Sequence, residues 1–239
     1  MSIQKINTAV ILAAGRGSRL GDKTKEMPKG FLNIGGETLI ERSIRLLKKN
    51  GIENIIVGVG HKGTVYEGIQ EQYGLKMYYN DEYASTESLY TLVCANAHVN
   101  GDFLLLESDL LYDESALKTI LNSEGPNVIL GSGYTDSGDE VYLHVNKSGS
   151  FRYLSQDTND KINAHAEFVG ISKVSFDLYK KLMDLPTIKK MKYEYGFNVL
   201  TQTEDIRVEK QGDLVWCEID DDHHFQRAKN LIWPKLSTK

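Results

Sequence analysis

The organisation of the chain follows from the run Ala9-Val10-Ile11-Leu12-Ala13-Ala14-Gly15-Arg16-Gly17-Ser18-Arg19-Leu20. Its apolar first half predicts a buried strand from Thr8 to Leu12. The strand runs into small residues, and Gly15 and Gly17 allow the backbone to approach a ligand closely and to adopt a positive φ angle. The run therefore predicts a strand that ends in a ligand-binding loop.

Three cations accompany this loop. Arg16 and Arg19 lie within it, and Lys29 follows in the segment Met27-Pro28-Lys29-Gly30. Backbone N–H groups and cations at the end of a strand form a cradle for anions, and a polyphosphate is the anion that we expect. The alternative is a glycine-rich turn with solvated basic residues. The joint occurrence of the strand, both arginines and the Pro-Lys step favours the cradle.

The loop also carries a resemblance. The segment from Leu12 to Leu20, followed by Pro28-Lys29-Gly30, resembles the signature loop of nucleotidyltransferases, which join a nucleoside triphosphate to a phosphorylated small molecule and release pyrophosphate. The order of the remaining segments is most similar to the choline-phosphate cytidylyltransferases and their phosphonate-activating relatives, which use 2-aminoethylphosphonate. The resemblance covers nearly the whole chain and is strongest at the loop.

Composition limits the class of protein. The 239 residues suffice for one large α/β domain, and 41% apolar and 26% charged residues are ordinary for a globular chain. A net charge of −5 argues against nucleic-acid binding. The two cysteines, Cys94 and Cys217, lie in apolar surroundings, which favours buried thiols over a disulfide. Without a membrane-length apolar run or a secretory signal, we expect no membrane partner and a cytoplasmic protein.

Strands alternate with helices along the first half. This order predicts a doubly wound, mostly parallel, Rossmann-like sheet in a single domain, residues 1–239. We expect a nucleotide-binding half, about 1–131, and an acceptor-binding half, about 132–239, that forms a small β-rich cover. The predicted strands are 8–12, 54–59, 75–79, 103–106, 128–130, 166–171 and 214–219, with a hairpin at 142–145 and 151–154. The predicted helices are 64–73, 85–97, 173–183, 190–202 and 222–231, with two more that begin near Thr38 and near Asp113 or Ser115.

Two acids are candidate metal ligands. Asp109 follows the apolar run 103–106, and Mg²⁺ prefers one or two carboxylates with water and phosphate oxygens in its other positions. The resemblance implies Asp109 as the first ligand and Asp220 as the second, with Asp221 in reserve and Asp222 as the N-cap of the last helix. His223-His224 raises zinc as an alternative, but no third ligand has a recognisable spacing.

The resemblance implies in-line attack of the acceptor on the α-phosphorus of CTP. Such an acceptor is largely ionised near neutral pH, so no general base is required, and catalysis reduces to positioning and charge stabilisation. We assign catalysis to Arg16, Lys29, Asp109 and Asp220 with Mg²⁺. The expected nucleotide-binding residues are Leu12, Ala13, Ala14, Gly15, Gly17, Arg19, Ser85, Thr86 and Ser88. The alternative role of Ser85 or Thr86 is a helix capping box.

The acceptor pocket separates the two nearest family members. A quaternary ammonium favours aromatic faces, whereas the segments 137–142 and 191–198 offer carboxylates and tyrosines. Carboxylates suit a primary ammonium, so 2-aminoethylphosphonate is the expected acceptor. The candidate acceptor-binding residues are Glu140 and Glu194 first, then Asp139, Glu167 and Tyr195. Two other acceptors stay open as alternatives, phosphocholine and a sugar 1-phosphate. A non-catalytic nucleotide-binding module is the alternative of another class, and a fused downstream aminotransferase domain is also possible.

Overall fold

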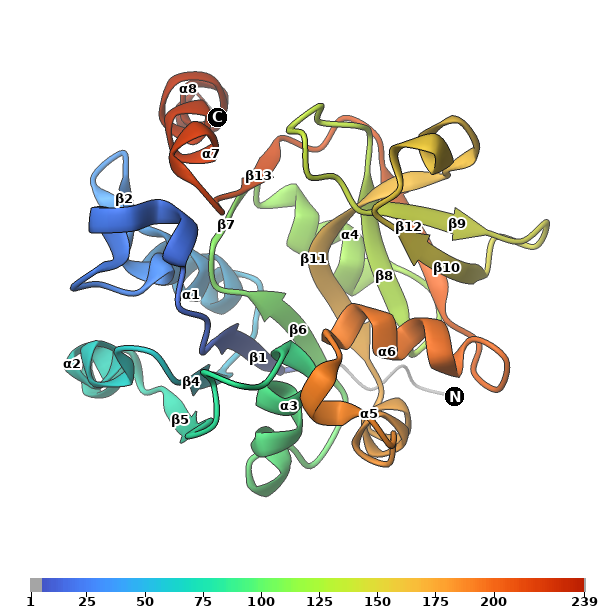
Figure 1. Cartoon of the computed structure of the whole chain (residues 1–239), viewed down its shortest axis with the longest axis horizontal. Helices are drawn as coiled ribbons and strands as arrows, with labels where there is room; N and C mark the ends of the chain where they lie inside the picture. Colours follow the sequence, from blue (N-terminus) through green and yellow to red (C-terminus); the bar gives the residue numbers. More distant parts are fainter. Residues whose placement is uncertain (1–5, 239) are drawn as a thin grey trace.

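A computed structural model describes residues 6–238 of the chain, which are built around one mixed sheet (Figure 1). Within these residues the sheet has nine strands, in the order β10-β9-β11-β6-β1-β4-β5, with β8 beside β11 and β12 beside β8. The parallel core of the sheet consists of β1 (Thr8–Ala13), β4 (Asn54–Val59), β5 (Lys76–Tyr79) and β6 (Phe103–Glu107). The other strands are β8 (Val128–Ser132), β9 (Tyr142–Val145), β10 (Phe151–Ser155), β11 (Ala166–Val174) and β12 (Arg207–Gln211).

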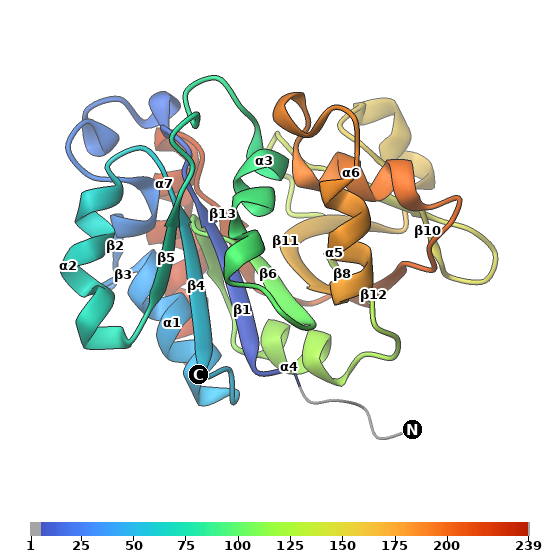
Figure 2. The same ribbon diagram turned by 90° about the horizontal axis from the view of Figure 1, so that it is seen from below.

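Helices cover both faces of the sheet (Figure 2). One face is covered by α1 (Leu39–Lys49), α2 (Gly63–Tyr73) and α4 (Ser115–Asn122). The opposite face is covered by α3 (Ser88–Val93), α5 (Phe176–Met183) and α6 (Tyr193–Leu200). Along β1, Ala9 and Ile11 point into the first layer and Val10 into the second, and all three are fully buried, as expected for a central strand. The doubly wound prediction is confirmed.

A third, smaller core joins the segment that follows β1 to residues 215–236. The helices α7 (Asp222–Arg227) and α8 (Trp233–Ser237), with the π-helical turn Ala228–Ile232 between them, pack against the segment that follows β1 (Figure 1). This segment contains the 3-10 turns Ser18–Thr24 and Lys29–Phe31 and the short strands β2 (Asn33–Ile34) and β3 (Glu37–Thr38). Helices α7 and α8 therefore lie beside the segment that follows the first strand.

Several boundaries differ from the predictions. Lys173 and Val174 complete β11, so α5 begins only at Phe176, after the cap Ser175. The predicted helix 85–97 begins at Ser88, and the predicted helix 190–202 is α6, Tyr193–Leu200.

Some strands also differ from the predictions, and β7 (Leu110–Tyr112) was not predicted. The final strand β13 (Trp216–Glu218) pairs with β7 (Leu110–Tyr112) outside the main sheet. The strand β12 was not predicted, because most of its residues, Arg207–Gln211, are polar and all are exposed or half-buried. It pairs in parallel with β8. No helix among residues 6–238 has the length and apolar character that crossing a bilayer requires.

Candidate active site

A cleft of about 480 Å³ lies at the carboxyl ends of β1 and β6. This is the edge where ligands bind in doubly wound sheets. The loop after β1 forms one wall, and residues of α3, α6 and the acidic strand ends form the others. The lining residues are Leu12, Ala13, Ala14, Gly15, Arg16, Gly17, Ser18, Arg19, Lys29, Tyr66, Tyr83, Thr86, Glu87, Ser88, Thr91, Glu107, Ser108, Asp109, Lys192, Glu194 and Glu218.

Gly17 gives the loop its shape. Its φ angle is +62°, and a Cβ atom there would lie 2.7 Å from Cγ of Lys29 and 3.1 Å from Cγ2 of Thr24. The Thr24 hydroxyl donates a 2.8 Å hydrogen bond to the Gly17 carbonyl, which holds the turn closed. Only glycine can adopt this positive φ angle and leave the space beside Lys29 and Thr24 free without strain. Gly15, by contrast, has no atom within 4 Å of an added Cβ.

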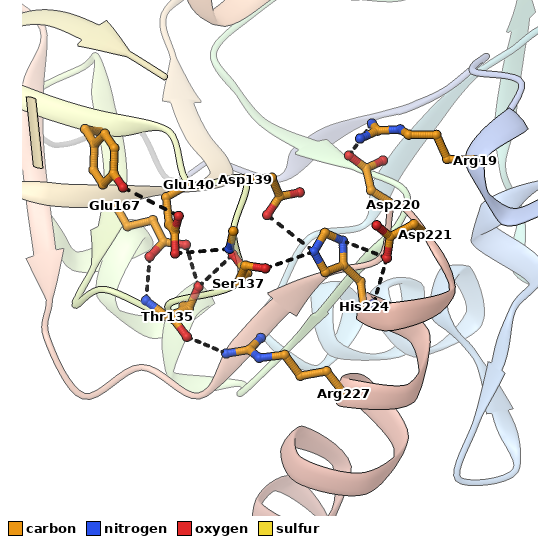
Figure 3. A network of polar contacts seen from close by, with 12 residues as sticks. Arg19, Thr135, Ser137, Asp139, Glu140, Glu167, Asp220, Asp221, His224 and Arg227 are labelled. Atoms are coloured by element: carbon orange, nitrogen blue, oxygen red, sulfur yellow. Dashed lines mark hydrogen bonds and ion pairs between the residues drawn. The ribbon is translucent and has the colours of Figure 1, made fainter. Parts of the chain in front are cut away.

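Lys29 bridges the two predicted metal ligands. Its Nζ donates to Oδ2 of Asp109 at 2.9 Å and also to Oδ1 of Asp220. Arg19 Nη2 donates to the other oxygen of Asp220 at 2.5 Å, as Figure 3 shows. Burial by itself lowers the pKa of Lys29, but the charges of Asp109 and Asp220 outweigh it and raise that pKa. Burial likewise opposes ionisation of Asp220, yet Lys29 and then Arg19 hold its pKa below the usual value.

A group of acids that includes Asp109 lies in the same cleft. Carboxylate oxygens of Glu107, Asp109 and Glu218 all lie within 4.8 Å of one another. Burial, followed by repulsion from neighbouring carboxylates, raises the pKa of Glu107 and of Glu218 well above the usual value. Glu194 is 5% exposed, its pKa is raised mainly by burial, and its Oε2 has no hydrogen-bond partner within residues 6–238. Their oxygens have the chemistry to hold a cationic ligand.

Sequence reasoning did not select Glu107, Glu218 or Lys192. The sequence nevertheless contains a pattern that indicates Glu107 and Glu218. Both Glu107-Ser108-Asp109 and Glu218-Ile219-Asp220 place acids two residues apart where a strand ends. Side chains two apart on extended chain point to the same side. Lys192 precedes α6, and its Nζ lies 4.0 Å from Oε1 of Glu194.

Most of the predicted nucleotide-binding residues line this cleft, but Ser85 does not. The Ser85 hydroxyl donates to the Glu82 carbonyl at 3.2 Å, and that of Thr86 donates to the same carbonyl at 2.9 Å. The capping-box alternative is wrong, because α3 begins at Ser88 after the N-cap Glu87, which makes no side-chain cap. The Arg16 guanidinium lies over the ring of Tyr83, 5.9 Å from its centroid.

The predicted acceptor residues separate into two places. Glu194 lines the main cleft and also an adjoining cavity of about 250 Å³, which Asp139 and Asp220 line too. Glu140 and Glu167 line a much smaller cavity of about 30 Å³. Tyr195 lines none of these three cavities within residues 6–238 and packs against the core of α3, α5 and α6 instead.

Glu167 is paired with the loop that joins β8 to β9. Its carboxylate accepts hydrogen bonds from the Thr135 N–H at 2.6 Å and from the Thr135 hydroxyl at 2.8 Å. Burial raises the pKa of Glu167 to about 7, although the hydrogen bonds from Thr135 act in the opposite direction. Glu167 therefore holds the loop in place from the β11 side (Figure 3).

Helix α7 holds the same loop from the other side (Figure 3). Arg227 Nη2 donates to the Thr135 carbonyl at 2.9 Å, and His224 Nε2 lies 3.4 Å from the Ser137 carbonyl and 3.5 Å from Asp139. The helix starts at the N-cap Asp221, which accepts from the His224 N–H at 2.8 Å. The prediction of Asp222 as the cap is wrong by one residue.

The donor set suits a hard divalent cation. Mg²⁺ takes oxygen ligands, and Glu107, Asp109 and Glu218 bring carboxylates to the main cleft, while Asp220 brings one to the adjoining cavity. The zinc alternative gains a third group, because Asp221, His223 and His224 have ligand atoms within 4.8 Å of one another. His224, however, already faces the loop through Nε2, and His223 is exposed.

These features define an α/β domain in which a cationic loop adjoins an acidic cleft. The chain belongs to the family of MobA-like NTP transferase domains, whose family model matches residues 9–159. The nucleotidyltransferase family suggested by the loop is thereby confirmed.

Three curated relatives are similar at low identity. The bifunctional IPC transferase and DIPP synthase of Aquifex aeolicus is 24% identical over 95% of this chain and 52% of its own length. The choline-phosphate cytidylyltransferase of Streptococcus pneumoniae is 33% identical over 44% of this chain and 45% of its own. The CMP-5'-(3-aminopropyl)phosphonate synthase of Streptomyces rubellomurinus is 28% identical over 52% of this chain and 20% of its own length. The chain thus spans about half the length of the first relatives that it matches.

Solved structures share the fold. The inositol-1-phosphate CTP transferase from T. maritima aligns with a TM-score of 0.84 at 19% identity and covers 98% of this chain and 96% of its own. At that identity the likeness concerns the fold, and it agrees with a Rossmann-like nucleotidyltransferase sheet.

Proposed function

We propose that this chain is a Mg²⁺-dependent cytidylyltransferase that joins CTP to 2-aminoethylphosphonate and releases pyrophosphate. The family supports nucleotidyl transfer. Relatives named as choline-phosphate cytidylyltransferase and as a CMP-aminopropylphosphonate synthase support CTP and a small amine-bearing acceptor. The nucleotide-binding and acceptor-binding halves, the cytoplasmic location and the role in phosphonate biosynthesis remain predictions.

One observation carries the proposal, namely the polarity of the cleft. Arg16, Arg19 and Lys29 line the loop wall of the cleft, and the carboxylates Glu107, Asp109, Glu194 and Glu218 line its other walls. A triphosphate requires cations, and an acceptor with an ammonium group requires carboxylates. The loop wall is therefore the proposed triphosphate site, and the acidic wall is the proposed site for the metal and the acceptor.

The chain's own residues would act by positioning and charge. Arg16 and Lys29 would neutralise the α-phosphate and the departing pyrophosphate, which stabilises the charge that develops in the transition state. No residue needs to remove a proton, since the acceptor oxygen is already largely ionised. Asp109 and Asp220 would hold Mg²⁺, which supplies further neutralisation of phosphate oxygens when it is bound.

Glu194 supports a primary ammonium on the acceptor. Its buried Oε2 lacks a partner within residues 6–238, and an ammonium N–H would satisfy it. A quaternary ammonium has no N–H donor and relies on aromatic faces. Among residues 6–238, neither tryptophan lines the main cleft or the adjoining cavity, and Trp216 lines only the small one. Glu140 and Glu167 are weaker candidates, because they lie in that small cavity.

The test is a substrate panel. Pyrophosphate release is measured with CTP, UTP and dTTP, each with 2-aminoethylphosphonate, phosphocholine, phosphoethanolamine and a sugar 1-phosphate. We expect the highest kcat/KM with CTP and 2-aminoethylphosphonate. Faster turnover of phosphocholine would change the acceptor and keep the enzyme class. Absence of pyrophosphate release with every pair would favour the non-catalytic module.

A further inference from the structure

The proposed metal ligands are already occupied by cations of the protein. Lys29 Nζ contacts Asp109 Oδ2 at 2.9 Å and Asp220 Oδ1, and Arg19 contacts Asp220 Oδ2 at 2.5 Å. Both oxygens of Asp220 and one oxygen of Asp109 are thus paired. Both aspartates are 8% exposed, so water compensates little for the loss of these partners.

A divalent ion and these cations compete for the same oxygens. A Mg²⁺ ion that is shared by Asp109 and Asp220 requires oxygens that Lys29 now contacts. Its positive charge would also repel an ammonium left in contact with the same carboxylates. The ion therefore binds both aspartates only if Lys29 moves to another anion.

The loop that carries these cations is also the proposed triphosphate site. Lys29 and Arg19 line the same cleft as Gly15 and Gly17, so a phosphate chain in the loop would lie within their reach. An incoming phosphate would take the two cations and leave the aspartates as unpaired buried carboxylates. Such carboxylates are strong ligands for a divalent cation.

We propose that Lys29 and Arg19 act as a built-in counter-ion that suppresses metal binding until a nucleotide is bound. This inference rests on the proposed function, because it takes the anion of the loop to be a nucleoside triphosphate. The free protein has a low affinity for the divalent ion. Nucleotide and metal then bind with positive coupling, and that coupling is reciprocal.

The test measures Mn²⁺ binding to the whole chain by electron paramagnetic resonance, without nucleotide. The variant Lys29→Met removes the bridging charge and is expected to bind Mn²⁺ at least tenfold more tightly than the wild type. The matched control is Lys23→Met, because Lys23 lies on the same loop but pairs at 2.5 Å with the exposed Asp222. The Mn²⁺ affinity of this control is expected to stay within twofold of that of the wild type.

Three results would overturn the proposal. The first is equal Mn²⁺ affinity of wild type and Lys29→Met, and the second is an equal gain in Lys23→Met, which would indicate a general effect of loop charge. The third is a double variant, Lys29→Met with Asp220→Asn, that still binds Mn²⁺ as tightly as Lys29→Met alone, since the ion would then bind away from Asp220. If Lys29→Met fails to fold, Arg19→Met is used instead, with an expected gain in Mn²⁺ affinity of at least threefold. An Arg19→Met variant that binds Mn²⁺ no more tightly than the wild type would likewise overturn the proposal.

A second measurement addresses the coupling. The ratio of Mn²⁺ affinities with and without saturating CTP is compared between the wild type and Lys29→Met. Chelation of Mn²⁺ by CTP is common to both proteins, so the comparison isolates Lys29. We expect the ratio to be at least tenfold larger in the wild type, and equal ratios would contradict the inference. Failure of the proposed function is seen separately, as absence of CTP binding or of pyrophosphate release.

Discussion

Replacement of Gly17 by alanine tests the geometry of the loop. An alanine at φ +62° adopts a left-handed conformation that costs about 1 to 2 kcal/mol. Its Cβ would also lie 2.7 Å from Cγ of Lys29. Lys29 cannot move away freely, because Asp109 and Asp220 hold its ammonium, so the overlap adds about 1 kcal/mol of overpacking. We expect Gly17→Ala to lower the free energy of unfolding by about 2 to 3 kcal/mol.

The assay is urea unfolding of Gly17→Ala, with Gly15→Ala as the matched control. An alanine at position 15 has open space around its Cβ and no positive φ, so its midpoint is expected to stay near that of the wild type. For a chain of this length, the loss in Gly17→Ala lowers Tm by about 4 to 12 °C. Equal midpoints for the two variants would refute the argument that Gly17 is required by its backbone and by Lys29.

Four further outcomes are expected. Lys29→Ala should lower kcat at saturating CTP by at least a hundredfold, because it removes transition-state charge stabilisation; near-normal turnover with weaker CTP binding would remove Lys29 from the catalytic residues. A chelator such as EDTA should abolish pyrophosphate release, and excess Mg²⁺ should restore it; full activity after chelation would contradict the metal requirement. Arg227→Ala should raise the KM for the acceptor more than that for CTP, because Arg227 holds the Thr135 carbonyl, whereas an equal rise in both would indicate general loss of structure. Glu167 has a folded-state pKa raised to about 7, against an ordinary value of 4.5. Between these pH values the folded protein binds more protons than the unfolded chain, so the free energy of unfolding should fall as pH rises from about 4.5 to 7. If the same fall with pH is measured for Glu167→Gln, Glu167 is not its cause.

Local patterns in the sequence predict most of the fold. The apolar run before Gly15 and the β-branched run 54–59 indicate central strands, because both faces of such strands are buried. Strand β12 escapes prediction, since it lies at an edge of the sheet beside β8 and most of its residues, Arg207–Gln211, are polar. Its existence depends on a neighbour that the local pattern does not reveal.

The site is predicted less completely than the fold. The loop residues are recognisable, because glycines and cations lie together in sequence. The roles of Glu194 and Glu140 could not be ranked from sequence, since their burial depends on how α6 and the loop after β8 pack. The link from His224 and Arg227 to that loop is likewise a contact between segments about 90 residues apart.

The bridge between Lys29 and Asp220 also has a consequence for biogenesis. The two residues are 191 positions apart, and Arg19 and Asp220 are 201 positions apart. During synthesis, the loop after β1 leaves the ribosome long before its acidic partner does. Until Asp220 emerges, the loop's cations remain available to any polyanion in the surroundings. The bridge can therefore form only after Asp220 has left the ribosome, through the slow closure of a very long polypeptide loop.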